Sequence, residues 1–256
     1  MATSSFAIVT GRYYEVFAVI HRFSPPVIIA TVWIHAGTAR LSTAPTIYLL
    51  CAACILAITW CFWFAKLVYL NLRIGSKLPR ARIEKDGKIM IVSVTLPRTW
   101  NFKAGQHVNL CIPSLRGSLL QWHPFALSSF ELVNGSTVIR LMIRERKGFT
   151  AVLANKRTPS QDMVALIDGP YGREIQLRTY GTVLLFASGI GIAGLLLYAQ
   201  QTLEQYYAQT TSCRRIFLFW EIDDSTAYGD IIHSHVHILA SHSVRSDAVE
   251  PGNGLT

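Results

Sequence analysis

A stretch of 25 residues without Asp, Glu, Lys or Arg runs from Leu41 to Ala65. Ile47–Leu70 overlaps this stretch, is rich in Leu, Ile, Ala, Trp and Phe, and carries one charge, Lys66, near its end. An α-helix needs about 20 consecutive apolar residues to cross the hydrocarbon core of a bilayer. The pattern therefore predicts a membrane span over about 46–70. The alternative, a buried helix of a soluble domain, is left open.

A second apolar segment precedes this one. Phe23–Ala39 carries no charged residue, while Glu15 and Arg22 lie before it and Pro25-Pro26 lies within it. Its length and apolarity predict another span, over about 13–36. Residues 1–72 are therefore expected to form two transmembrane helices.

Basic residues follow the second predicted span closely. They are Arg73, Lys77, Arg80, Arg82, Lys85 and Lys88. The segment between the two spans holds only Arg40. Because positively charged segments stay on the cytoplasmic side of a membrane, everything after residue 72 is expected in the cytosol. We expect the host membrane to be the plasma membrane.

The composition excludes several other classes of protein. Hydrophobic residues make up 51% of the chain and charged residues 15%, against about a quarter charged in soluble domains. The net charge is +9, but the basic residues do not gather in one stripe, so no nucleic-acid partner is expected. Five cysteines in 256 residues are too few for a disulfide scaffold.

Short strand-like segments with turn residues between them occupy residues 80–175 and predict an antiparallel β-barrel. The predicted strands are Lys88–Leu96, Gln106–Ile112, Phe125–Phe130, Thr137–Ile143 and Met163–Ile167. Asn134-Gly135 is a hairpin turn signal. Asp168-Gly169-Pro170-Tyr171-Gly172 is expected to be a tight turn that closes the barrel.

The pattern changes again after Gly181. Thr182–Ala187 and Arg215–Trp220 read as buried strands, and Leu195–Gln209 between them has helical periodicity. This order predicts a βαβ unit with a parallel sheet, as part of an α/β nucleotide-binding domain over 180–225. Residues 226–256 are polar, rich in His and Ser, and match no pattern.

Two short motifs have the form of phosphate-binding turns. Ser188-Gly189-Ile190-Gly191-Ile192-Ala193-Gly194 is a GxGxxG sequence between a strand and a helix, where glycines let the backbone approach a diphosphate. No acidic residue stands clearly at the expected distance after it. Lys147-Gly148-Phe149-Thr150 begins a helix-like stretch, and Thr150 is predicted to be its N-cap, with free amides suited to phosphate.

Three histidines are candidates for cofactor contacts. His21 and His35 lie 14 residues apart on the first predicted span, which places them about 40° apart on one face and about 21 Å apart along the axis. Each could hold one axial position of a separate haem; alternatively, His21 is interfacial and His35 caps the helix. His123 lies in the segment Trp122–Ser129, which ends in two serine hydroxyls where a strand could meet a ligand. A buried strand with a satisfied histidine is the alternative.

Taken in order, these features resemble the ferric reductase and NADPH oxidase superfamily, and fungal ferric-chelate reductases in particular. The matching residues are Tyr14-Glu15-Val16-Phe17, His21, Trp33-Ile34-His35, His123-Pro124-Phe125-Ala126-Leu127-Ser128-Ser129, Gly148-Phe149-Thr150, Asp168-Gly169-Pro170-Tyr171-Gly172, Ala187-Ser188-Gly189-Ile190-Gly191-Ile192 and Phe217-Leu218-Phe219-Trp220-Glu221. The pairing of HPFALSS with GPYG at this spacing is specific. The resemblance covers about residues 12–225.

The resemblance implies membrane helices followed by a cytosolic ferredoxin-NADP-reductase-like module, with an FAD-binding barrel and a partial NADPH-binding domain. NADPH would give hydride to FAD, and single electrons would pass through two b haems to Fe(III) or Cu(II) chelates outside. By the same resemblance, His21 and His35 are axial haem ligands, and His123 to Ser129 form the flavin-binding strand. Gly148 to Thr150 contact the FAD pyrophosphate, and Gly189 to Ile192 the NADPH diphosphate. The redox chemistry belongs to the cofactors, so no residue is assigned a catalytic role.

Departures from the family pattern imply a truncated form. Only the last two of about six spans are present, and no histidine lies on the second predicted span to complete a haem. The nicotinamide domain stops after its second strand, and the later Cys-Gly motif is absent. Two alternatives therefore remain open: a non-catalytic remnant or regulatory subunit that binds a full-length reductase paralogue, and an oxidase that makes superoxide from oxygen. Turnover by the chain alone is left open.

Overall fold

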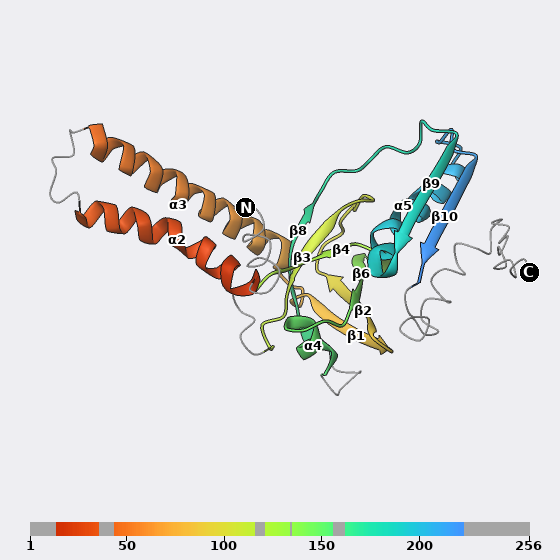
Figure 1. Cartoon of the computed structure of the whole chain (residues 1–256), viewed down its shortest axis with the longest axis horizontal. Coiled ribbons are helices and arrows are strands. Elements are labelled where there is room, and N and C mark those ends of the chain that lie inside the picture. The colour runs from red at the N-terminus through yellow and green to blue at the C-terminus, as the bar shows by residue number, and fades with distance from the viewer. Residues whose placement is uncertain (1–13, 36–43, 116–120, 134, 156–161, 223–256) are drawn as a thin grey trace, which may run out of the picture.

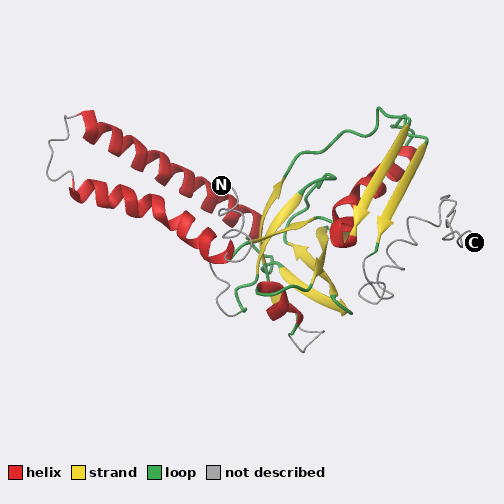
Figure 2. Cartoon of the chain, viewed as in Figure 1, coloured by secondary structure: helices red, strands yellow, loops and turns green. Residues whose placement is uncertain are grey.

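The computed structural model describes residues 14–35, 44–115, 121–133, 135–155 and 162–222. Two long helices lie side by side and extend away from one side of a β-rich body (Figure 1). A helix with two adjacent strands lies on the opposite side of that body (Figure 2). The chain thus places its apolar helices and its parallel α/β unit at opposite ends.

The two long helices are α2 (Tyr14–His35) and α3 (Ala44–Asn71). They touch through an edge-to-face contact between the rings of Phe23 and Trp60, with centroids 6.1 Å apart. Within the described residues, α3 is the one helix long and apolar enough to cross a bilayer, and none of its most apolar segment is buried. The membrane placement of α2 stays a prediction.

Helix α2 continues through Pro25 and Pro26. A proline has no N–H, so Pro25 leaves the carbonyl of His21, four residues earlier, without its helical donor. The hydroxyl of Ser24 donates to that carbonyl at 3.2 Å. The side chain before the proline pair therefore replaces one of the hydrogen bonds that the prolines remove.

The body is built from two antiparallel sheets. The strands are β1 (Arg80–Asp86), β2 (Ile89–Leu96), β3 (His107–Cys111), β4 (His123–Ala126), β5 (Ser129–Val133), β6 (Ser136–Arg144), β7 (Met163–Val164) and β8 (Leu166–Tyr171). The five-stranded sheet has the order β5-β6-β2-β1-β7 and the three-stranded sheet the order β4-β3-β8. A short helix, α4 (Phe149–Ala154), follows β6.

A single apolar core joins the two sheets. Alternate residues of β2, such as Val92 and Val94, meet Val108 and Leu110 of β3 in this core, and all four are fully buried. Alternation of side chains along a strand sends every second residue to the same face, which explains why β6 buries Thr137, Ile139 and Leu141 while Val138 and Arg140 between them are partly exposed. The predicted antiparallel β fold is confirmed.

Two predicted strands are each divided into two. Phe125–Phe130 contains parts of β4 and β5, which belong to different sheets, and Met163–Ile167 contains β7 and the start of β8. The prediction of a tight turn over Asp168–Gly172 is wrong, because β8 continues through Asp168-Gly169-Pro170 to Tyr171. Strand β8 lies at the edge of its sheet and pairs with β3 alone. Pro170 can therefore sit in it without removing a hydrogen bond to a strand on the other side.

The predicted βαβ unit is confirmed. It consists of β9 (Thr182–Ser188), the 3₁₀ turn η2 (Gly189–Ile192), α5 (Ala193–Tyr207) and β10 (Arg215–Glu221). Strands β9 and β10 pair in parallel, in the register Thr182 to Arg215 through Ser188 to Glu221. One face of this pair packs on α5 and the β body. The other face is exposed and apolar, with the rings of Phe186 and Phe219 stacked at 4.9 Å.

Leu141→Ala should lower the free energy of unfolding by about 2–5 kcal/mol, because it leaves a cavity at a fully buried position in the shared core. Leu132→Ala, at a position 65% exposed on β5, is the control and should change that free energy by less than about 0.5 kcal/mol. Denaturant unfolding of the full chain in detergent measures both. Equal losses would contradict the packing described for β6.

Candidate functional site

Two motifs that are far apart in the sequence meet beside β4. The ring of His123 stacks on Phe149 at the start of α4, with centroids 4.0 Å apart and planes 20° from parallel. The ring of Phe125 lies 6.4 Å from Phe149. His123 and Phe125 are two residues apart in a strand and therefore share a face. The structure thus brings the HPF and GFT motifs into one aromatic cluster.

The start of α4 differs from the prediction. Gly148 is its N-cap, with φ of 81° in the region that glycine tolerates best, so the prediction that Thr150 is the cap is wrong. Thr150 lies inside the helix instead, where its hydroxyl accepts from the Arg146 amide at 2.8 Å and donates to the Arg146 carbonyl at 3.0 Å. Thr150 therefore holds the Arg146–Gly148 turn from inside the helix. Arg146 and Lys147, which precede the helix, are exposed.

The glycine turn lies against the same strand. A Cβ added to Gly194 would be 3.8 Å from the Cβ of Ala126, so the start of α5 is in van der Waals range of β4. Trp220 at the end of β10 donates through its indole N–H to the carbonyl of Gly189 at 2.9 Å, which anchors the turn to the second strand. Gly191 has nothing within 4 Å of an added Cβ and faces open space.

The two serines of the HPFALSS segment face elsewhere. The Ser128 hydroxyl accepts from the Met142 amide at 3.1 Å, so it links β6 to the chain between β4 and β5. Both serines line a cleft of about 900 Å³ between the five-stranded sheet and α5. The Ser129 hydroxyl oxygen is buried there without a hydrogen-bond partner among the described residues. Two other residues of the predicted cofactor-binding motifs, Leu127 and Ile192, lie in the core and are each 1% exposed.

These residues fit a flavin nucleotide. Phe125 supplies an aromatic face that is partly exposed beside β4, and the exposed basic pair Arg146 and Lys147 adjoins the Gly148 turn. Backbone at a glycine turn and nearby cations are both favourable for phosphate. Gly191 adds a second open turn, at the start of the helix that approaches β4. The structure therefore groups an aromatic surface with two phosphate-compatible turns.

The histidines of α2, predicted to be haem ligands, offer one imidazole at each of two positions. Both are exposed, and His21 stacks on Phe17 at 5.6 Å. The described part of α3 contains no histidine, and no group of three or more His, Cys, Asp or Glu residues that could hold a metal occurs among the described residues. Haem held by two imidazoles needs a second ligand for each iron. The described helices therefore do not complete a haem.

Residues 76–175 match the family of FAD-binding domains. The chain is 28% identical over 208 residues to ferric/cupric reductase transmembrane component 2 of Saccharomyces cerevisiae, which covers 78% of the chain and 27% of that protein. The chain is similar to members of the ferric reductase and NADPH oxidase superfamily. Ferric reductase transmembrane component 1 of Schizosaccharomyces pombe is 25% identical over 80% of the chain and 42% of its own length.

A plant member of the superfamily matches a shorter segment. The probable respiratory burst oxidase homolog protein I of Arabidopsis thaliana is 31% identical over 41% of the chain and 13% of its own length. Among solved structures, a ferredoxin NADP+ reductase from Neisseria gonorrhoeae with bound FAD and NADP is 19% identical, with a TM-score of 0.47 over 64% of each chain. The chain spans about a quarter to two fifths of the two fungal relatives.

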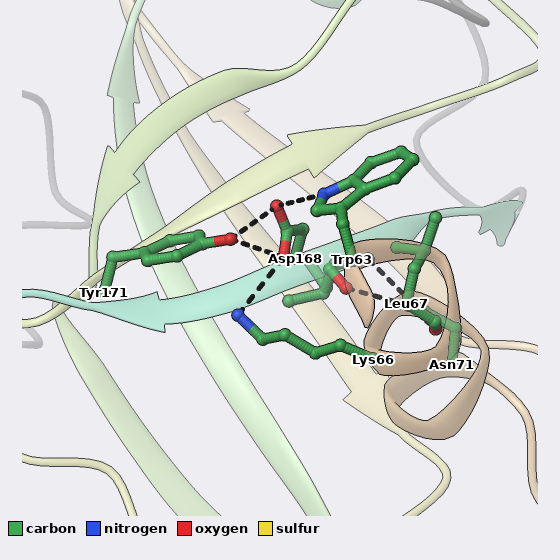
Figure 3. A network of polar contacts seen from close by, with 7 residues as sticks. Trp63, Lys66, Leu67, Asn71, Asp168 and Tyr171 are labelled. Carbon is green, nitrogen blue, oxygen red and sulfur yellow. Dashed lines mark hydrogen bonds and ion pairs between the residues drawn. The ribbon is translucent and has the colours of Figure 1, made fainter. Parts of the chain in front are cut away.

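A polar network that the sequence did not predict lies where α3 meets β8 (Figure 3). Asp168 is 4% exposed and is surrounded by donors. The Tyr171 hydroxyl lies 2.8 and 2.9 Å from its two oxygens, the Trp63 indole nitrogen 3.3 Å and the Lys66 ammonium 3.4 Å. The signal in the sequence was Lys66, the single charge near the end of the apolar segment.

The same network changes the acidity of Tyr171. Burial raises the pKa of its phenol above the ordinary value of 10.0, and the hydrogen bond to Asp168 raises it further, while Lys66 opposes both effects. The folded protein therefore holds this proton more tightly than the unfolded chain does. By linkage, the resulting stability is present below about pH 10 and is lost as the pH rises above that value.

Tyr171→Phe should lower the free energy of unfolding at pH 8 by about 1–3 kcal/mol, because a hydrogen bond to a buried carboxylate is lost. The variant should also lose less stability than the unmodified chain between pH 10 and 11, since Tyr171 no longer titrates. Denaturant unfolding at each pH measures this difference, with Tyr180→Phe, at an exposed tyrosine, as the control. Parallel pH profiles for Tyr171→Phe and the unmodified chain would contradict the assignment.

Proposed function

We propose that this chain is a ferric-chelate-reductase-like membrane flavoprotein that takes electrons from NADPH and passes them towards Fe(III) or Cu(II) chelates outside the cell. The observation that carries the proposal is the meeting of three motifs at β4: His123–Ser129, Gly148–Thr150 and Gly189–Ile192. Their ring contacts and the approach of Gly194 to Ala126 support one shared flavin and nicotinamide site.

The β body would hold FAD through its own surfaces. Bound FAD would supply the chemistry that the side chains lack, by accepting a hydride from a nicotinamide and releasing electrons singly. Phe125 would stack against the isoalloxazine, while His123, packed on Phe149, keeps that face of β4 rigid. The Gly148 turn and the exposed side chains of Arg146 and Lys147 would hold the pyrophosphate.

The βαβ unit would position the dinucleotide. Gly189 has φ of 52°, and its carbonyl accepts a hydrogen bond from the Trp220 indole N–H, so the turn is held against the end of β10. Gly191 leaves room for close approach of a diphosphate at the start of η2 and α5. Because α5 begins next to Ala126, a nicotinamide ribose held at this turn would lie towards β4.

Helices α2 and α3 would cross the plasma membrane, with the β body in the cytosol. α3 has 28 residues, which correspond to about 42 Å of helix and exceed the roughly 30 Å hydrocarbon core. Arg73, Lys77 and Arg80 follow it on the side of the β body. Their charge favours the cytosolic side.

Haem b enters the proposal only in part. His21 and His35 would each supply one axial imidazole, and a partner imidazole would come from a helix outside the described residues. Fe(III) or Cu(II) chelates, or oxygen in the oxidase alternative, would be the terminal acceptors.

A regulatory role is the second candidate, and an exposed surface favours it. Leu184, Phe186, Phe217 and Phe219 form the outer face of the β9–β10 pair and are between 44 and 69% exposed. A parallel sheet is ordinarily covered on both faces. A full-length reductase paralogue that covers this face would make the chain a non-catalytic subunit.

FAD titration of the purified full chain in detergent should produce flavin absorbance near 450 nm at about one FAD per chain. Phe125→Ala should weaken FAD binding about tenfold, equivalent to about 1.4 kcal/mol, because it removes the aromatic surface on β4. The control is Phe64→Ala, at an exposed phenylalanine of α3. Absence of bound flavin in the unmodified chain, or an equal loss in both variants, would contradict the proposed site.

Rapid mixing with NADPH separates the two candidate functions. If the chain is a reductase, its FAD-loaded form should lose absorbance at 450 nm within the mixing experiment under anaerobic conditions. A regulatory subunit should retain that absorbance alone, and bleaching should appear only when a full-length reductase is added. Replacing Gly191 with Asp is the matched variant, because a carboxylate in the open turn repels a diphosphate and should slow bleaching at least tenfold.

A further inference from the structure

We infer that Asp168 is a positioning residue that seats the last two turns of α3 on β8, so that the helix pair and the β body behave as one rigid unit. This inference goes beyond the proposed function, because it concerns how the helices and the flavin strand are held relative to each other. The observations that carry it are a buried carboxylate with partners from two elements, an amide pair and a tryptophan contact (Figure 3).

The carboxylate of Asp168 joins α3 to β8. Its side chain is 6% exposed and takes a salt bridge from Lys66 at 3.4 Å and a hydrogen bond from the Trp63 indole at 3.3 Å, both from α3. Tyr171, from its own strand, donates to the same group, and Lys66 lies 4.1 Å from the centre of the Tyr171 ring. A buried carboxylate must be paired, so removal of its charge leaves the Lys66 ammonium without its counter-ion and weakens the hydrogen bonds from Tyr171 and Trp63.

Asn71, about two turns beyond Trp63 on α3, forms hydrogen bonds with the backbone of β8. Its side-chain amide donates to the Ile167 carbonyl at 2.8 Å, and its side-chain oxygen accepts from the Ile167 amide at 2.8 Å. This is the double exchange that a neighbouring strand would make with a residue of β8. Asn71 is 2% exposed and Ile167 is 1% exposed, so both bonds are sheltered from water. The helix end therefore occupies the free edge of β8.

Trp63 extends the contact to the residues around β4. Its ring meets Trp122, the residue directly before His123, edge to face at 6.1 Å. The guanidinium of Arg22, next to His21 on α2, lies 5.6 Å from the centre of the Trp63 ring. The hydrogen bond from Trp63 to Asp168 therefore orients the side chain that touches both α2 and the start of the flavin-binding motif.

Arg98 holds the same helix end from another direction. Its guanidinium donates to the carbonyls of Tyr69 at 3.0 Å and Leu72 at 3.3 Å, which lie at the end of α3 and have no helical donor ahead of them. Residues 63–71 are thus docked on the β body, and residues 44–62 remain, about 28 Å of helix. That length is close to the roughly 30 Å thickness of a hydrocarbon core, so the β body would rest directly on the membrane surface.

The functional consequence rests on the proposed function. If FAD binds at β4, the docked Trp63 sets a constant separation between that cofactor and the helix pair. The rate of electron transfer depends on the distance between donor and acceptor, and a flexible joint would make that distance variable. Asp168 does not touch the candidate flavin site, so its role is to hold α3 in place.

Distance measurement between two spin labels tests the inference on the full chain in nanodiscs. In a background with Cys51, Cys54 and Cys61 replaced by Ala, labels are placed at Tyr48→Cys and Leu132→Cys, which are 73% and 65% exposed. Tyr48 lies near the far end of α3, so a small rotation at the joint gives a large displacement there. Asp168→Asn keeps the side-chain volume and removes the charge.

We expect one narrow distance distribution in the unmodified chain and a distribution at least twice as wide in Asp168→Asn. Asp162→Asn is the matched control, because its ion pair with Arg82 is exposed on both sides, and it should leave the width unchanged. Trp63→Phe, which keeps the ring and removes the donor, should also widen the distribution if Asp168→Asn does not fold. Equal widths in the unmodified chain and in the foldable variants would overturn the inference.

This outcome is separate from that of the proposed function. The distance measurement needs neither FAD nor NADPH, so failure to bind FAD contradicts the flavin site alone. A wide distribution in the unmodified chain itself contradicts the rigid joint alone.

Discussion

Strand β3 is hydrogen-bonded along both edges, and the candidate site depends on this pairing. Leu110 is opposite His123 of β4 on one side and opposite Ile167 of β8 on the other. Because a shift of one residue sends every side chain of a strand to the opposite face, the register of β3 decides where the flavin motif and the helix joint both lie. Full burial of Val108 and Leu110 in the core holds that register.

The same strand explains why a polar joint can exist beside an apolar core. Leu110 and Ile167 point into the core, while the neighbouring position places Asp168 at the edge, opposite Asn109. Edge strands present unpaired backbone groups that proteins usually cover. Here α3 covers that edge with one amide, one ammonium and one indole rather than with another strand. Charge pairing therefore compensates for burying the carboxylate.

Local patterns were enough to predict most of the elements, because the information for them lies within each segment; β1 (Arg80–Asp86), with five charged residues among its seven, was not predicted. Ile47–Leu70 is apolar throughout, and Thr182–Ala187 and Arg215–Trp220 are separated by a glycine turn and a helical repeat. The antiparallel β body was predicted from short strand-like segments with turn residues between them. The family motifs also indicated which segments meet a flavin, and the contact of His123 with Phe149 joins two of them.

Long-range pairing decides what the sequence did not predict. The chain changes sheets between β4 and β5 because Ser128 bonds to Met142, a partner that no local pattern names. Asp168-Gly169-Pro170 has turn-forming residues, yet pairing with β3 and contacts from Lys66 and Trp63 make it a strand. Gly148 rather than Thr150 caps α4 because the Thr150 hydroxyl is used by Arg146.

We propose that β4, the start of α4 and the η2 turn surround one flavin. An experimentally determined structure of the FAD-loaded full chain in a nanodisc is the decisive test. We expect isoalloxazine density against Phe125 and pyrophosphate density at Gly148. Ordered flavin elsewhere would contradict it, above all in the cleft between the five-stranded sheet and α5 that Ser129 lines.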